Sequence, residues 1–260
     1  MENYRLHGLK PYKLITLHGG PGALGELNDL SKVLSKEDGV IEHLQTKDSI
    51  NLLIDDIKYI INKKVTVPVT IIGYSWGAWL AILFTAKYKT LVEKIILVSS
   101  GPFEEKYSRN IMDKRFNRFD EKEKKVFLDL SKKFSDGNNI CYEDFKEFIS
   151  LIEKADSYKL IKRKNDELDF HHDLYKQIWE EASNLRKEKV LIKSLEKINS
   201  KIKVIHGNYD PHPVDGVIKP LNKLDKKYEL NILEKCGHIP WKEEYAKDKF
   251  YKVLKKMIRN

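Results

Sequence analysis

Short apolar runs alternate along this chain with segments whose apolar residues recur every three or four positions. The runs predict buried β-strands at residues 13–17, 39–44, 67–72, 94–100, 201–207 and 228–233. Helical spacing is clearest between the early strands, at residues 24–34 and 50–61. Strands that alternate with helices in this way favour an α/β protein with a mostly parallel, doubly wound sheet.

The pattern changes in the middle of the chain. From residue 103 to residue 200 strand-like runs vanish, and charged and aromatic residues follow a helical period. We therefore predict a core formed by residues 1–102 and 201–260, with an all-helical cap at 103–200 inserted before the last two core strands. A C-terminal helix is predicted to begin at Pro240 and Trp241.

A glycine-flanked serine follows the strand predicted at 67–72. Residues 73–77 read Gly-Tyr-Ser-Trp-Gly, and the helix-like residues 78–83 come directly after them. A lone G-x-S-x-G also occurs as an ordinary small-residue turn. Between a strand and a helix, however, it is the pattern of a nucleophile elbow, which projects the serine Oγ above the sheet. The context predicts Ser75 as a nucleophile.

A serine hydroxyl needs a base to take its proton and an acid to orient that base. In enzymes with this elbow the acid and then the histidine follow the serine along the chain, in loops after later strands. Asp210 follows the fifth predicted strand and His238 follows the sixth, so we predict them as acid and base. Glu104 and Glu105, after the fourth strand, are the alternative acids.

A glycine-rich loop follows the first predicted strand, where residues 18–22 read His-Gly-Gly-Pro-Gly. Backbone without side chains can lie close to a substrate. In G-x-S-x-G enzymes one oxyanion donor is the N–H of the residue after the nucleophile, and another comes from such a loop. We predict the N–H groups of Trp76 and Gly20 as these donors. His18 is expected to hold the loop by hydrogen bonds, and His206 to be structural.

The glycine-rich loop at 18–22, taken together with the elbow at 73–77, resembles the proline iminopeptidase-like branch of the α/β-hydrolase superfamily. The resemblance covers most of the chain outside its middle, and it implies a cofactor-free serine hydrolase with Ser75, His238 and Asp210 as its triad. Two features depart from that branch. Only residues 1–12 precede the first predicted strand, so the first sheet edge is expected to be short or absent. Residues 45–49 replace an Asp-Gln-Arg-Gly-type loop.

Composition adds limits on partners. The formal charge is +9, but lysines are interleaved with acids and no nucleic-acid motif accompanies them, so neither nucleic acid nor membrane is an expected partner. Two cysteines in no metal-type spacing predict no disulfide framework, and the first residues lead into no apolar signal segment, which favours a cytoplasmic protein. Neighbouring His171 and His172 point about 100° apart on a helix, so they are not expected to share a metal with Asp169 or Asp173.

The leading hypothesis is hydrolysis of an ester, amide or peptide-type acyl bond in a small molecule or short peptide, through an acyl-enzyme on Ser75. Peptidase action would need cap carboxylates for the substrate ammonium; Glu180, Glu181, Asp169 and Asp173 are available. The alternatives are a ligand-binding or regulatory module that retains the triad, and a cofactor-free perhydrolase. The sequence predicts neither the substrate nor the oligomeric state.

Overall fold

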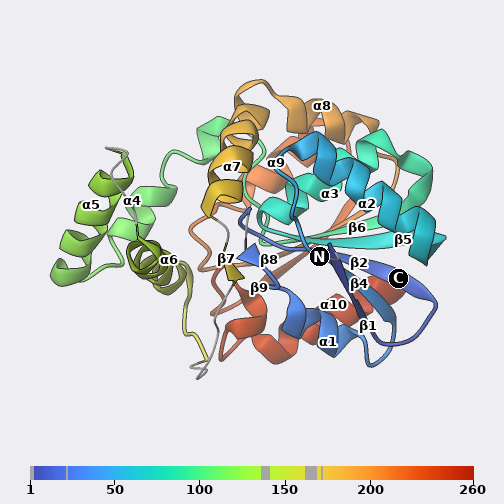
Figure 1. Cartoon of the computed structure of the whole chain (residues 1–260), viewed down its shortest axis with the longest axis horizontal. Helices are drawn as coiled ribbons and strands as arrows, with labels where there is room; N and C mark the ends of the chain where they lie inside the picture. Colours follow the sequence, from blue (N-terminus) through green and yellow to red (C-terminus); the bar gives the residue numbers. More distant parts are fainter. Residues whose placement is uncertain (1–2, 22, 136–140, 162–168, 171) are drawn as a thin grey trace.

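A seven-stranded sheet forms the centre of the protein, as seen in a computed structural model that describes residues 3–21, 23–135, 141–161, 169–170 and 172–260. The strand order is β1-β4-β2-β5-β6-β8-β9 (Figure 1). The edge strand β1 pairs antiparallel with β4, and the other neighbours pair in parallel. The bounds are β1 Tyr4–His7, β2 Tyr12–Leu17, β4 Gly39–His43, β5 Val65–Tyr74, β6 Val92–Val98, β8 Lys201–Gly207 and β9 Tyr228–Leu233.

The middle of the sheet is buried on both faces because helices cover each side. In the central strand β5, Ile71 lies between Ile15 of β2 and Ile95 of β6, and all three are almost inaccessible to solvent. Such strands read as continuous apolar runs. This burial explains why the sequence pattern located β2, β5, β6 and β8 so closely.

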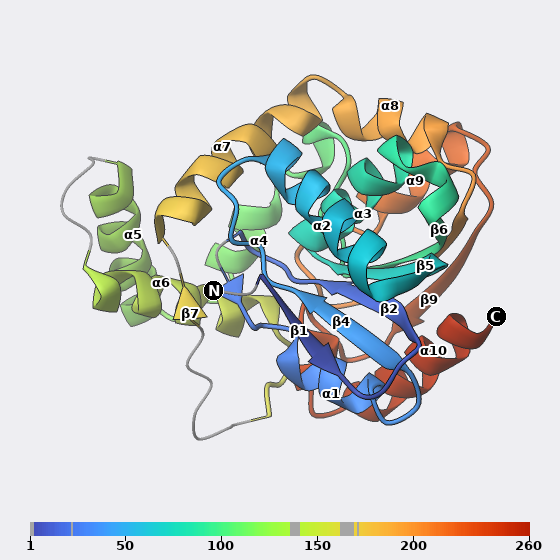
Figure 2. The ribbon, with the colours of Figure 1, turned by 45° about the vertical axis from the view of Figure 1, so that its right-hand side comes forward.

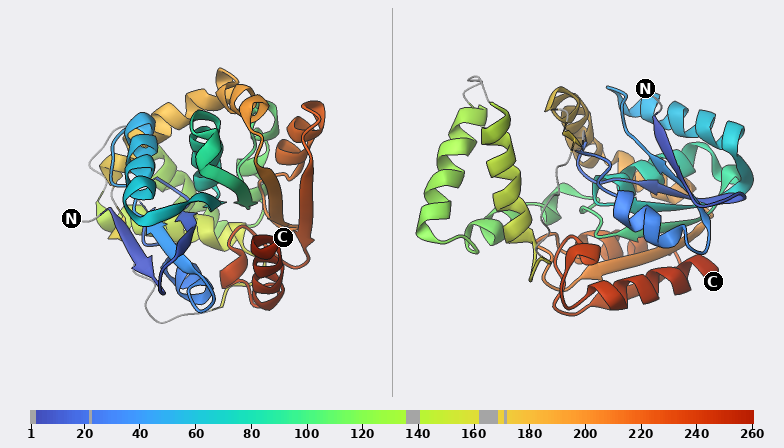
Figure 3. Two further views of the ribbon diagram at one scale, coloured as in Figure 1. Left: turned by 90° about the vertical axis from the view of Figure 1, so that its right-hand side faces the viewer. Right: turned by 60° about the horizontal axis from the view of Figure 1, so that its bottom comes forward.

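Two apolar clusters lie on opposite faces of the sheet. One joins the sheet to helices α2, α3, α8 and α9, and the other joins it to α1 and α10. Figure 3 shows the two layers of helices on either side of the strands. The bounds are α1 Asn28–Leu34, α2 Ile50–Lys64, α3 Trp76–Lys87, α8 Val190–Lys197, α9 Asp215–Lys223 and α10 Lys247–Arg259.

The segment between β6 and β8 divides into two parts. Helices α4 (Ile111–Phe116), α5 (Glu121–Ser135) and α6 (Tyr142–Asp156) form a lobe that projects from the core (Figures 1 and 2). This lobe has its own apolar cluster around Phe127. Helix α7 (His172–Lys187) and α8 instead pack on the core, since Ile178, Ala182, Leu191 and Leu195 belong to its apolar cluster.

Several sequence expectations were wrong in detail. The insertion is not all-helical, because β7 (Asp169–Phe170) pairs antiparallel with β3 (Ala23–Leu24). The first helix begins at Asn28, since residues 23 and 24 belong to β3. Pro240–Lys242 is a short 3-10 turn, and the C-terminal helix begins only at Lys247. Two-residue strands and single turns are too short to show a period.

Two further 3-10 turns, Lys89–Leu91 and Glu105–Tyr107, flank β6. The sheet begins with the four-residue strand β1, so the expectation of a short first edge is confirmed. Among the described residues, no helix is both long enough and apolar enough to cross a bilayer.

Candidate active site

Ser75 occupies the turn between β5 and α3. Its φ of 51° and ψ of −114° are strained for a residue with a side chain. The flanking glycines allow this turn because backbone closes in on both. A Cβ on Gly73 would lie 2.4 Å from the carbonyl oxygen of Gly77, and a Cβ on Gly77 would lie 2.2 Å from that of Leu17. The G-x-S-x-G pattern thus has a steric cause here.

The structure brings Ser75, His238 and Asp210 together. The Nε2 atom of His238 lies 2.9 Å from Ser75 Oγ, and its Nδ1 lies 2.8 Å from Asp210 Oδ2. Asp210 follows β8 and His238 follows β9, both at the carboxyl end of the sheet where β5 delivers Ser75. Asp210 and His238 are both buried.

Charge in the site is set by Asp210. Burial alone would raise the pKa of this carboxyl, but His238, His212 and His206 hold it well below its ordinary value. An ionised carboxylate only accepts hydrogen bonds, so His238 donates from Nδ1 and presents the lone pair of Nε2 to Ser75. Burial lowers the pKa of His238, yet the charge and hydrogen bond of Asp210 bring it above the ordinary value of 6.5.

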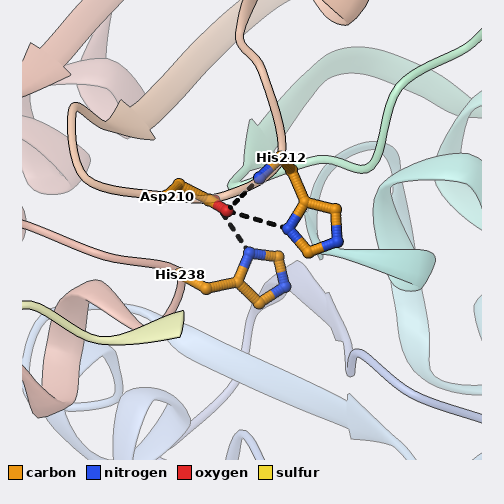
Figure 4. A group of neighbouring side chains, drawn as sticks. All are labelled: Asp210, His212 and His238. Atoms are coloured by element: carbon orange, nitrogen blue, oxygen red, sulfur yellow. Dashed lines mark hydrogen bonds and ion pairs between the residues drawn. The ribbon is translucent and has the colours of Figure 1, made fainter. Parts of the chain in front are cut away.

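A second histidine contacts the other oxygen of Asp210. The backbone N–H of His212 donates to Oδ1 over 2.9 Å, and its ring Nδ1 donates to the same oxygen over 2.8 Å. The ring also stacks on His238 with 4.3 Å between centroids and 28° between planes (Figure 4). His212 was not predicted from the sequence, although its position two residues after the predicted acid was the available signal.

The same three side chains also resemble a metal site in their spacing. Ligand atoms of Asp210, His212 and His238 lie within 4.8 Å of one another, a grouping that occurs once among the described residues. Both imidazole Nδ1 atoms are hydrogen-bonded to the carboxylate, however. A cation among them would displace the proton through which Asp210 orients His238. The arrangement therefore suits acid–base chemistry better than metal binding.

Gln45 links the glycine-rich loop to the elbow. His18 donates from Nδ1 to the carbonyl of Gly19 over 3.1 Å, and its Nε2 accepts the N–H of Gln45 over 3.2 Å. Burial lowers the pKa of His18 to about 3, so its ring stays neutral and able to accept. The Gln45 amide donates to the carbonyl of His18 over 2.9 Å and accepts from the Trp76 indole over 2.8 Å.

The two predicted oxyanion donors lie at the ends of this network. Gly20 lies in the loop that His18 and Gln45 hold, and Trp76 opens α3 directly after Ser75. A Cβ built on Gly20 would have no described atom within 4 Å, so space opens beside it. The half-buried Glu26 also fixes the loop, because its Oε2 accepts the N–H of Gly19 over 2.8 Å. Burial, above all, raises the pKa of Glu26 to about 7.

The loop that carries His238 is tied to the end of α6. The N–H of His238 donates to the carbonyl of Asp156 over 2.8 Å. The fully buried Glu243 accepts from the N–H groups of Gly237 and Tyr158, each over 2.8 Å. Since α6 belongs to the projecting lobe, the position of His238 depends on where that lobe sits.

The alternative acids lie elsewhere. Glu104 forms an ion pair with Lys106 over 2.8 Å, and Glu105 pairs with Arg186 over 3.1 Å. His206 is buried at the end of β8 and donates to the carbonyl of His212 over 2.8 Å, which agrees with a structural role.

Some predicted residues cannot be placed. Gly22 and His171 lie outside the described residues. The side chains of Asp169, His172 and Asp173 are likewise outside what the structure describes. The predictions for these residues stay predictions.

Comparison with known proteins agrees with the fold. Residues 45–245 match the family described as the alpha/beta hydrolase fold, and the chain therefore belongs to that family. No curated protein matches the sequence.

Solved structures of similar fold include VinJ, at 15% identity and a TM-score of 0.70, over 98% of this chain and 94% of that one. Proline iminopeptidase from Mycobacterium smegmatis has 15% identity and a TM-score of 0.65, over 98% and 93%. The meta-cleavage product hydrolase CumD from Pseudomonas fluorescens IP01 has 17% identity and a TM-score of 0.64, over 98% and 93%. At these identities the likeness concerns the fold.

Proposed function

We propose that the protein is a serine hydrolase that cleaves an ester, amide or peptide-type acyl bond. The observation that carries this proposal is the unbroken hydrogen-bond chain from Ser75 through His238 to Asp210, built on a strained elbow. Ser75 is the nucleophile and His238 is the general base. Asp210 orients the His238 ring and stabilises its protonated form.

In the first half-reaction Ser75 Oγ attacks the acyl carbon while His238 Nε2 takes its proton. The negative oxygen of the tetrahedral intermediate is stabilised by the N–H groups of Trp76 and Gly20. His238 then gives the proton to the leaving group, and the acyl group remains on Ser75. Water, activated by His238, attacks this acyl-enzyme and frees the acid. No step requires a cofactor.

We propose a broader class of substrates than the peptides that the resemblance to proline iminopeptidase implies. Among the carboxylates available for a substrate ammonium, Glu181 already accepts the N–H of Ile50 over 3.0 Å at the start of α2. The similar folds carry names as different as an iminopeptidase and a meta-cleavage product hydrolase. We propose residues 103–200 as the cap that selects the substrate over Ser75.

A fluorophosphonate probe tests the nucleophile directly. We expect the wild type to gain one phosphonyl group by intact-protein mass, and Ser75→Ala to gain none. The labelling rate should fall as the pH drops through the pKa of His238, because the protonated ring cannot accept the serine proton; this pKa lies above 6.5.

A chromogenic panel of short-chain esters, long-chain esters and aminoacyl anilides, run on both proteins, then defines the substrate. Prolyl anilide turnover would favour a peptidase, and ester-only turnover an esterase. Equal turnover by wild type and Ser75→Ala contradicts the proposal. Ligand-induced stabilisation of an unlabelled wild type would indicate a binding module instead.

A further inference from the structure

We propose that His212 is a positioning residue for the catalytic pair: it fixes the Asp210 carboxylate, holds the plane of the His238 ring, and moderates the attraction of Asp210 for the His238 proton. The inference deepens the proposed function and rests on it, since it takes His238 to be the base.

The first observation is how the acceptor sites of Asp210 are divided. Oδ1 receives both hydrogen bonds from His212, and Oδ2 receives the bond from His238. The carboxylate cannot turn about its bond to Cβ without losing one set of donors. His212 therefore fixes the direction in which Oδ2 faces His238.

The second observation is the stack between the two rings. With centroids 4.3 Å apart, the ring of His212 covers one face of His238 and limits its rotation. His212 is itself held in place, because its carbonyl accepts the hydrogen bond from the buried His206. A ring that must keep Nε2 within 2.9 Å of Ser75 Oγ benefits from this support.

The third observation concerns charge. Since Asp210 is ionised, His212 must present N–H to it from Nδ1. Burial, followed by the charge of His238, lowers the pKa of His212 to about 4, so His212 stays neutral when His238 becomes charged. A neutral donor on Oδ1 draws charge away from Oδ2 and weakens its hold on the His238 proton.

Other groups around His238 act on the same proton and stay unchanged in the test. The titratable and charged groups that face it are Asp210 and His206 at the end of β8, Asp156 of α6, Arg115 of α4, Tyr74 of β5 and Glu26 after β3.

Two substitutions separate the donor from the ring. His212→Phe keeps a stacking ring but removes the Nδ1 donor, whereas His212→Asn can donate from its amide but has no ring. Fluorophosphonate labelling rates would be measured from pH 5 to pH 9 for both variants and the wild type, with thermal unfolding as a check of folding.

For His212→Phe we expect the acid limb of the pH profile, where the labelling rate falls as the pH drops, to move to higher pH. Without the donor, Asp210 holds the His238 proton more strongly, so more His238 is protonated and inactive at a given acidic pH. Labelling at pH 6, relative to the variant's own plateau, should fall about threefold below the wild-type ratio. For His212→Asn we expect an unmoved limb and a plateau lowered about three- to tenfold, because the ring support is lost.

The outcomes distinguish the two proposals. A wild type that is never labelled refutes the proposed function. The inference is overturned if the wild type is labelled and both variants lose labelling over the same acidic pH range as the wild type. A merely structural His212 would change only the plateau rate. Nuclear magnetic resonance of ¹⁵N-labelled histidines tests the inference on the wild type alone. We expect His212 to keep a single protonated ring nitrogen while His238 titrates. Protonation of both rings together would overturn the inference.

Discussion

Gln45 is the residue that couples the two halves of the proposed oxyanion hole. Its backbone and side chain bond to His18 on one side, and its amide oxygen accepts from Trp76 on the other. The glycine-rich loop and the elbow are otherwise separate segments of chain. Since oxyanion stabilisation depends on donors held at a fixed place, Gln45 should matter for catalysis without touching the substrate.

Replacing Gln45 with Met keeps the length of the side chain and removes its polar contacts. We expect Gln45→Met to label at least about tenfold more slowly than wild type, because losing one oxyanion donor outright costs about 100-fold or more. The exposed neighbour Lys47, changed to Met, serves as the matched control and should label normally. Wild-type labelling by Gln45→Met would show that the loop is held without it.

The residues proposed for catalysis could be predicted, and so could the part of His18 in holding its loop, whereas the other supports could not, for a physical reason. Ser75, Asp210 and His238 each sit at a fixed place after a strand, so chain order and strand pattern locate them. Gln45 acts through His18, which is 27 residues away, and Glu243 acts through Gly237 and Tyr158. Contacts of this kind follow from the packed chain and leave no local pattern.

At the scale of elements, buried periodic segments were the predictable ones. The strands β5 and β8 and the helix α2 carry enough apolar positions to show a period. Helix α9 was missed, since it contains Pro220 and spans only nine residues. Its existence depends on packing against the core through Val217 and Leu221.

Helix α4 joins the lobe to the loop that carries Asp210. Arg118, just beyond its end, donates to the carbonyl of Tyr209 over 2.8 Å and to that of Ala155 over 2.7 Å. Its guanidinium lies 3.7 Å from the centre of the Tyr209 ring. Arg115 binds Asp156 through two bonds of 2.6 Å, next to the carbonyl that holds His238. Arg115 of α4 and Arg118 just after it thus steady both the loop of Asp210 and the loop of His238.

Arg118→Met tests this link because it retains the aliphatic stem and removes the donors. Two part-buried carbonyls lose their partners, at a cost of about 1–3 kcal/mol, so Tm should drop by about 2–8 °C. The labelling rate should fall several-fold as the Asp210 loop loosens. Arg109→Met, at an exposed position before α4, is the control for loss of charge. Equal behaviour of the two variants would remove α4 from this role.

At the scale of the whole molecule, the fold holds separate apolar clusters. Those on the two faces of the sheet share its strands, whereas the cluster around Phe127 lies within the lobe of α4, α5 and α6. Figure 1 shows this lobe standing apart from the layers of the core. The lobe nevertheless supplies Asp156 to the His238 loop. Local opening of the lobe should therefore disturb the site while the sheet stays intact.

Phe127→Ala should open the lobe selectively. The Phe127 ring is buried and lies 5.3 Å from Phe119 and 5.4 Å from Phe148 between centroids, so its removal leaves a cavity that costs about 3–5 kcal/mol. Hydrogen exchange should rise across α4 to α6 and stay slow in β5 and α3, and Ser75 labelling should slow with it. Leu128→Ala changes the exposed neighbour on α5 and should alter neither signal. Faster exchange throughout the sheet in Phe127→Ala would show instead that lobe and core unfold as one cooperative unit. The hydrogen bonds at Asp156, Arg118 and Glu243 would then couple the two parts although their apolar clusters are separate.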